Sequence, residues 1–155
     1  MHAIFWARGK RLTSWLAHGN RILISALTAA LSAQLLKFVL YAIGRRKAQY
    51  ERLFGAGGMP SSHSAMVAAL VFSIAFRYGW KSPDFAISSV FGLIVLYDAL
   101  SVRRTVGLQS RYLNRLARSD DYPDGDKSLP EFVGHTPMEV IAGTLWGLLI
   151  SRLFY

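Results

Sequence analysis

The sequence predicts an all-α integral membrane protein, a helical bundle of about four transmembrane helices with a surface helix and an acidic loop. Three observations support this fold class. Of the 155 residues, 52% are hydrophobic and only 17% are charged, a high apolar share for a soluble domain. The apolar residues gather in long blocks that each contain one or two charges. The segments between the blocks are rich in glycine, proline, serine or charged residues, which commonly end helices.

The first apolar block, residues 22–43, has Lys37 as its single charge and is long enough to cross a hydrocarbon core of about 30 Å. Three further blocks reach a spanning length only with their flanks, as tilted or partly buried helices would. These blocks cover residues 65–78, 85–100 and 138–155. The alternative interpretation is a soluble and very hydrophobic helical bundle.

Four spans would define a multi-pass topology. Residues 44–63, the end of the third helix and residues 105–137 would lie on one side of the membrane. Both termini and the turn near Lys81 would lie on the other side. Basic residues are dense on both sides, so the charge distribution does not orient the chain.

The chain has the length of one domain, residues 1–155. Residues 1–20 are basic and contain tryptophan and leucine, so we expect an N-terminal segment that lies along the membrane surface. The sequence contains no cysteine, which excludes disulfides and thiolate metal sites. Its net charge of +9 fits anionic lipid head groups as partners, and no nucleic-acid motif accompanies that charge.

The third apolar block is followed by charged residues. We expect Arg103 and Arg104 at the C-terminus of the third helix, where they would complement the helix dipole. Asp98 is spaced to pair with either arginine about one turn later. Residues 105–136 are then expected to form an amphipathic helix, over about residues 107–118, and an acidic loop.

A glycine-rich loop precedes the second block and reads GGMPSSHS at residues 57–64. Glycine and proline end the preceding helix, and serine is a strong N-cap for the next one. The unpaired N–H groups at such a helix start, with the helix dipole behind them, attract anions. His63 lies at this position and can exchange a proton near neutral pH. The alternative is an ordinary turn with capping serines and one polar histidine.

The expected topology gathers several polar residues at one membrane face: His63, Arg103, Arg104, His135 and, by snorkelling, Lys37. Two helices begin at that face, after the two histidines, so their positive N-termini would point into the same region. These residue types suit the binding and cleavage of a phosphate. For Lys37, the alternative is that its stem only covers apolar surface.

Three motifs in this order resemble the divergent branch of the type 2 phosphatidic acid phosphatases, which are akin to vanadium-dependent haloperoxidases. The first is the loop at residues 57–64. The second is YDA with VRR, within residues 97–104, and the third is GHTPMEV at residues 134–140.

The resemblance implies phosphotransfer without a metal or another cofactor, on a lipid phosphate or pyrophosphate. His135 would attack phosphorus and form a phosphohistidine, Glu139 would orient His135, and His63 would protonate the leaving oxygen. Imidazole is a competent nucleophile for this reaction. The residues implied in holding the phosphate are Lys37, Ser61, Ser62 and either Arg103 or Arg104, with Asp98 and Arg45 as supporting residues.

The sequence departs from the family pattern at several positions. Ser62 stands where the family has glycine, and Glu139 where aspartate is usual. Residues 136–139 also match a capping box, which would give Glu139 a purely structural role. Gly44, followed by Arg45, replaces a second basic residue.

Two larger departures concern the whole chain. About thirty residues separate the arginine pair from His135, where the family has only a few. This gap and Ser62 favour the alternative function, a membrane interaction protein that binds phosphate without turnover. The chain also has fewer spans than many membrane enzymes of the family, which is a reason to expect a homodimer. The expected partners are membrane lipids and a phosphorylated lipid substrate.

The acidic segment allows a different alternative. Asp120, Asp124, Gly125 and Glu131 fall at positions one, five, six and twelve of a calcium-loop template. Tyr122, at position three, is not a ligand. A solvated acidic loop or a lid over the site is therefore the favoured interpretation.

Overall fold

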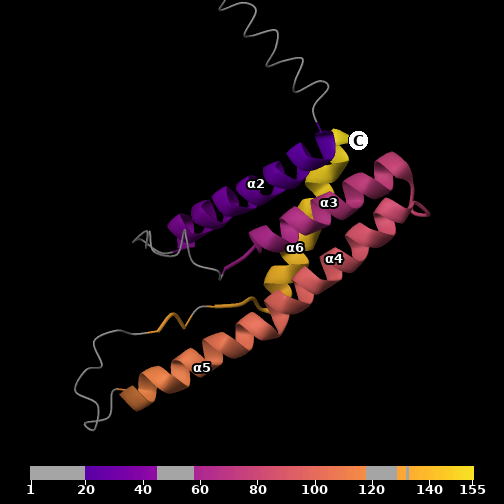
Figure 1. Ribbon diagram of the computed structural model, residues 1–155. Helices are drawn as coiled ribbons and strands as arrows, with labels where there is room; N and C mark the ends of the chain where they lie inside the picture. Colours follow the sequence, from indigo (N-terminus) through magenta and orange to yellow (C-terminus); the bar gives the residue numbers. More distant parts are fainter. Residues whose placement is uncertain (1–19, 45–57, 118–128, 132) are drawn as a thin grey trace, which may run out of the picture.

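The computed structural model describes residues 20–44, 58–117, 129–131 and 133–155, all of them in helices or in the segments that join helices (Figure 1). The helices in these ranges are α2 (Arg21–Gly44), α3 (Ser62–Tyr78), α4 (Pro83–Leu100), α5 (Val102–Ala117) and α6 (Pro137–Phe154). The predicted all-α membrane bundle is confirmed.

Helix α3 lies at the centre of the bundle. It packs against α2, α4 and α6, and its contact with α6 is the most extensive in the bundle. The ends of α2 and α4 and the starts of α3 and α6 lie at one end of the bundle, while the C-terminus lies at the other (Figure 1). This arrangement agrees with the topology expected from the sequence.

Small side chains allow these helices to approach closely. Ala29 and Ala33 of α2 pack against Ala65 and Ala69 of α3 in the core. Along α6, two glycines face α3: a Cβ atom on Gly143 or Gly147 would collide with the carbonyl oxygens of Ser61 or Ala65. Packing of small residues is how helices associate in a bilayer, where lipid tails remove the hydrophobic drive between them.

Two serine hydroxyl groups of α2 are paired with side chains of neighbouring helices. The Oγ of Ser73 in α3 donates to the Oγ of Ser25 in α2 over 3.0 Å. The indole Nε1 of Trp146 in α6 donates to the Oγ of Ser32 in α2 over 2.9 Å. Such pairs satisfy polar groups that could not reach water inside a bilayer.

Within the described part of the chain, three helical segments are long and apolar enough to cross a membrane: Arg21–Ile43, Pro83–Ala117 and Pro137–Phe154. Helix α3, the fourth helix of the bundle, has 17 residues and is therefore about 26 Å long. Large apolar side chains cover the outer surface, including those of Leu31, Leu35, Ile87, Leu93 and Leu145. This is the surface that lipid tails would contact.

The structure corrects the expected boundary after the third apolar block. Helix α4 ends at Leu100, and α5 begins at Val102, well before residue 107. Only Ser101 interrupts them, with φ −108° and ψ −74°, and helical hydrogen bonding resumes at once because its carbonyl accepts from Thr105 N over 2.9 Å. Arg103 and Arg104 therefore lie in the first turn of α5, so the prediction that they complement the dipole at a helix C-terminus was wrong.

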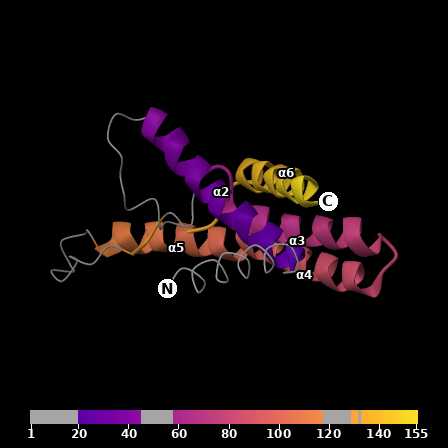
Figure 2. The same ribbon diagram turned by 90° about the horizontal axis from the view of Figure 1, so that it is seen from above.

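Helix α5 extends beyond the bundle in nearly the direction of α4 (Figures 1 and 2). The chain then returns along it. The side-chain amide of Asn114 donates to Leu129 O over 2.9 Å and accepts from Leu129 N over 2.8 Å. Gly107 leaves room for the backbone of Glu131 and Val133, which a Cβ atom there would strike. Leu129, Glu131 and Val133 are thus held against α5.

Candidate active site

The starts of α3 and α6 lie side by side and form the base of the candidate site. The backbone N–H of Ser61 donates to the carbonyl of Glu139 over 3.0 Å, and Gly143 leaves no space between the Ser61 carbonyl and α6. Both helices have their positive dipole end here. An anion at this point would therefore experience two aligned helix dipoles.

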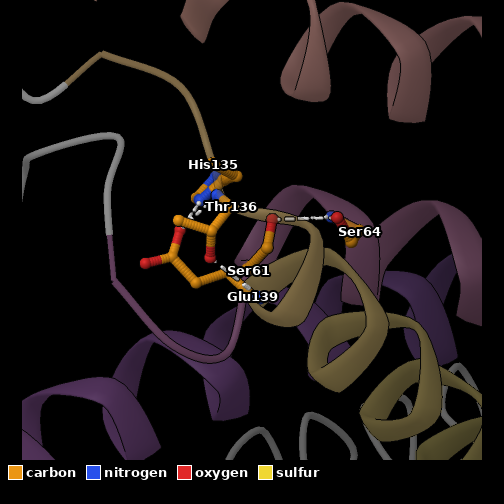
Figure 3. A network of polar contacts seen from close by, with 5 residues as sticks. All are labelled: Ser61, Ser64, His135, Thr136 and Glu139. Carbon is orange, nitrogen blue, oxygen red and sulfur yellow. Dashed lines mark hydrogen bonds and ion pairs between the residues drawn. The ribbon is translucent and has the colours of Figure 1, made fainter.

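Ser61 caps α3, as the sequence predicted for the serines of the loop. Its Oγ accepts hydrogen bonds from the backbone N–H of Ser64 over 3.3 Å and from the Oγ of Ser64 over 2.9 Å (Figure 3). Ser61 is fully buried, so its hydroxyl holds the loop together. The amides of Ser62 and His63 come earlier in the first turn, where helix geometry provides no carbonyl partner.

Glu139 performs two tasks with one carboxylate oxygen. Its Oε2 lies 3.1 Å from Nδ1 of His135 and also accepts from the backbone N–H of Thr136 over 3.0 Å (Figure 3). The Oγ1 of Thr136 accepts from Glu139 N over 3.4 Å, which completes a capping box. The capping role and the contact with His135, considered as alternatives from the sequence, occur together. A carboxylate only accepts, so the proton of neutral His135 is on Nδ1 and the Nε2 lone pair is free.

The backbone around His135 is attached to the junction of α4 and α5. Gly134 has φ 100°, a conformation that favours glycine. A Cβ atom there would collide with the backbone of Arg103 and Arg104. The N–H of His135 donates to Ala99 O over 3.1 Å. The chain leaves the bundle after Ala99, follows α5, and returns to the same place at His135.

This closure accounts for the long gap between the arginines and His135 in the sequence. Helix α5 leads away from the bundle and residues 129–131 and 133 return along it, so the two ends of this part of the chain meet. The arginine pair therefore lies next to the loop that carries His135, residues 133–136, called here the histidine loop. About thirty residues separate the arginines from His135 along the chain.

Burial shapes the electrostatics of His135. Only 2% of its side chain is exposed. Burial lowers the pKa of His135 below its ordinary value, the hydrogen bond and charge of Glu139 oppose this change, and the charges of Lys37 and His63 add to it. The imidazole is therefore neutral at pH 7, the form in which it can act as a nucleophile.

Lys37 reaches the same cluster from α2. It is only 7% exposed, and its stem lies against Gly58, where a Cβ atom would be 3.2 Å from Cδ of the lysine. The charge of Lys37 acts on both His63 and His135, and the charge of Glu139 acts on Lys37. The stem thus lies against the loop at Gly58, and the charge of the ammonium group acts on both histidines of the site.

The opposite side of the site is open to solvent. His63 is exposed in the first turn of α3. The Nε of Arg103 lies 2.6 Å from Oδ2 of Asp98, with exposed side-chain fractions of 48% and 39%. Charges on both members of this pair act on His63. The predicted pairing of Asp98 with an arginine is thus observed, and the partner is Arg103.

Of the remaining predicted residues, two lie beside the site. Ser62 is partly exposed at the start of α3, and Arg104 is exposed on α5. Arg45, Asp120 and Asp124 lie outside the described residues. The carboxylate of Glu131 accepts from Asn114 Nδ2 over 2.9 Å and pairs with Arg111 at 3.6 Å. No three His, Asp or Glu side chains in the described ranges group as metal ligands.

Sequence reasoning missed the residues that place the site without contacting a substrate. Gly134, Gly143, Ala99 and Asn114 act through backbone approach or backbone hydrogen bonds. Gly134 carried a usable signal, because a glycine directly before a candidate histidine suggests a special backbone conformation. The other three gave none, since their partners are far away along the chain.

The chain is similar to known sequences over most of its length. The model of the divergent PAP2 family matches residues 18–150. The uncharacterized membrane protein YuiD of Bacillus subtilis (strain 168) is 37% identical over 145 residues, which cover 85% of this chain and 92% of YuiD. No solved structure matches the chain. Together with the three apolar helical segments, the match to YuiD identifies the chain as a membrane protein.

Proposed function

The chain belongs to the divergent PAP2 family, and from this premise we propose that it is a membrane phosphatase. It hydrolyses a lipid phosphate or pyrophosphate through a phosphohistidine on His135. The observation that carries the proposal is the contact between Nδ1 of His135 and Oε2 of Glu139, located where two helices begin. This contact leaves Nε2 as the reactive nitrogen, next to groups suited to an anion.

The reaction has two steps. In the first, the Nε2 lone pair of His135 attacks phosphorus, the bond from phosphorus to the leaving oxygen breaks, and that oxygen takes a proton from His63. In the second, water attacks the phosphohistidine, His63 takes a proton from the water, and the P–N bond breaks. Inorganic phosphate leaves and both histidines return to their starting forms. Proton transfer of this kind typically contributes about 10²–10⁴-fold to the rate.

Positive groups surround the place where charge develops. The Lys37 ammonium, the Arg103 guanidinium and the first-turn amides of α3 supply the donors, and the dipoles of α3 and α6 add to their field. Stabilisation of the charge on the transferred phosphoryl group is the main protein contribution to such reactions.

The position of the site supports a lipid substrate. The histidines lie at the starts of α3 and α6, in a bundle whose outer surface is apolar. A lipid phosphate carries its charge at the head-group layer while its tails remain in the bilayer. The substrate therefore matches the change in polarity along the bundle.

The test is phosphate release from purified lipid phosphates in detergent, with EDTA present. His135→Ala should reduce kcat by at least about a thousandfold, because it removes the nucleophile. Lys81→Ala, at the opposite end of the bundle, serves as the matched control and should leave the rate unchanged. Loss of activity in EDTA, or an active His135→Ala variant, would contradict the proposal.

A second candidate function is phosphate binding without turnover. The observation that favours it is the burial of His135, because a side chain that is 2% exposed restricts the approach of phosphorus to Nε2. Tight binding of orthovanadate by the purified protein, with no hydrolysis of any lipid phosphate supplied, would support this candidate over the phosphatase.

A further inference from the structure

Two neighbouring arginines occupy the first turn of α5, and the structure gives them different surroundings. Arg103 pairs through its side chain with Asp98, the last acidic residue of α4. Gly134 packs against the backbone of both arginines, and the side chain of Arg104 is exposed on α5. The two residues are therefore not equivalent, although the sequence alone does not distinguish them.

The geometry of the pair leaves part of Arg103 available. The Oδ2 of Asp98 accepts a hydrogen bond from the Nε–H of Arg103 over 2.6 Å. A guanidinium group has five N–H donors in a planar fork, so a contact at Nε leaves the two terminal nitrogens with donors for another group. A phosphate is the group that such a fork binds in two-point fashion.

The same pair is connected electrostatically to the site. The charges of Arg103 and Asp98 both act on His63. The charge of Arg104 is not among the charges that act on His63 or His135. The guanidinium that borders the site is thus the one that Asp98 holds.

We propose that Asp98 is a positioning residue that fixes Arg103 beside His63 as the phosphate ligand, and so determines which of the two arginines serves the site. This inference rests on the proposed function of the same site. Arg104 then acts through its backbone, as the surface on which the histidine loop rests.

A purely structural role for the ion pair makes a different prediction. The pair joins α4 to α5 across Ser101, so it could simply hold the two helices together. Half-exposed pairs contribute little to stability. In that case, removal of the Asp98 charge would lower the melting temperature slightly and would leave phosphate binding unchanged.

The experiment measures orthovanadate binding to the purified full chain in detergent, by titration calorimetry and by the rise in melting temperature. Asp98→Asn and Arg103→Lys should each weaken binding by about tenfold, the effect expected for loss of one well-oriented charge-assisted contact. Arg104→Lys should bind like the unmodified chain. The matched control is Glu131→Gln, which breaks a similar pair with Arg111 farther along α5 and should also leave binding unchanged.

A charge-reversal variant distinguishes the two roles of Asp98, positioning Arg103 and joining α4 to α5. The double variant Asp98→Arg with Arg103→Asp keeps an ion pair across the junction but moves the guanidinium to α4. It should restore the melting temperature and leave orthovanadate binding weak. Asp98→Glu, which keeps the carboxylate, should recover part of the binding.

The outcomes distinguish this inference from the proposed function. Unchanged vanadate binding in Asp98→Asn, or a larger loss in Arg104→Lys than in Arg103→Lys, overturns the inference even if the chain hydrolyses lipid phosphates. Weak binding in Asp98→Asn and Arg103→Lys, with no hydrolysis by the unmodified chain, supports the inference while contradicting the phosphatase.

Discussion

The start of α6 and the start of α5 both bring charged side chains to the candidate site, but one is enclosed and the other is exposed. His135 and Glu139 are fixed by a capping box and by glycine contacts with α3. Arg103 and Asp98 are held mainly by each other and are each more than one third exposed. Under the proposed function, the enclosed part (His135 and Glu139) fixes the nucleophile, and the exposed part (Arg103 and Asp98) binds the phosphate. Substitutions in the enclosed part should therefore have the larger effects.

The largest expected effect comes from Glu139→Gln. Glutamine can still complete a capping box, so the helix start should survive, but a neutral amide no longer holds Nδ1 of His135 as a carboxylate does. We expect kcat to fall by about 10²–10⁴-fold, as when the orienting carboxylate of other catalytic histidines is removed. Phosphate release and thermal unfolding should be measured on the same sample.

Thr136→Ala is the matched control for that variant. It removes the N-cap oxygen and leaves the contact between His135 and Glu139 in place. We expect a loss of about 1 kcal/mol in stability and a kcat close to that of the unmodified chain. If Thr136→Ala lowers kcat as much as Glu139→Gln, then capping, and not orientation of the imidazole, is what Glu139 contributes.

The next effect concerns the packing beneath the site. In Gly143→Ala, the new Cβ atom would strike the Ser61 carbonyl and push α3 from α6. We expect destabilisation of about 1–3 kcal/mol and a fall in kcat of up to about 10²-fold, since displacements near 1 Å misalign reacting groups.

Gly92 of α4 also faces α3, and Gly92→Ala serves as the comparison for Gly143→Ala. Its nearest neighbour would be a movable side-chain carbon of Val71, at 3.2 Å, so both stability and kcat should change little. Equal effects of the two substitutions on kcat would show that close contact of α3 with α6 has no special part in the site.

The smallest expected effect is a lowered midpoint in the titration of the His135 imidazole. Burial lowers the pKa of His135 against the opposing influence of Glu139, so the midpoint should lie below the ordinary value of about 6.5. The neutral nucleophile is then present at pH 7 and is lost only as the pH falls through this lowered pKa. NMR of isotopically labelled imidazoles in detergent measures the midpoint, and a value above 6.5 would contradict the enclosed environment.

Much of the fold followed from local pattern. The apolar blocks predicted the helices of the bundle, and the serine-rich and threonine–proline segments predicted two helix starts, which Ser61 and Thr136 indeed cap. These features depend on neighbours within one turn, so the sequence contains them directly. The break at Ser101 was not predictable, because an interruption of one residue leaves no trace in the periodic pattern.

The site was only partly predictable for a related reason. Residue types and topology placed Lys37, His63, His135 and the two arginines at one membrane face. They did not show how the arginines reach the histidines. The closure that brings Arg103 to them depends on the hydrogen bond from His135 N to Ala99 O and on Gly134, which are contacts between distant positions. The double role of Glu139 was visible only as two competing interpretations, because one carboxylate oxygen accepts from both partners.

The most direct measurement is the identity of the phosphorylated atom. A lipid phosphate labelled in its phosphoryl group would be mixed with the purified protein, quenched in alkali within one turnover, and analysed by mass spectrometry and ³¹P NMR. Because Glu139 occupies Nδ1 of His135, the phosphoryl group should be found on Nε2 of His135. A phosphoryl group on His63 or on Nδ1 of His135 would contradict the proposed mechanism, and so would turnover without any phosphohistidine.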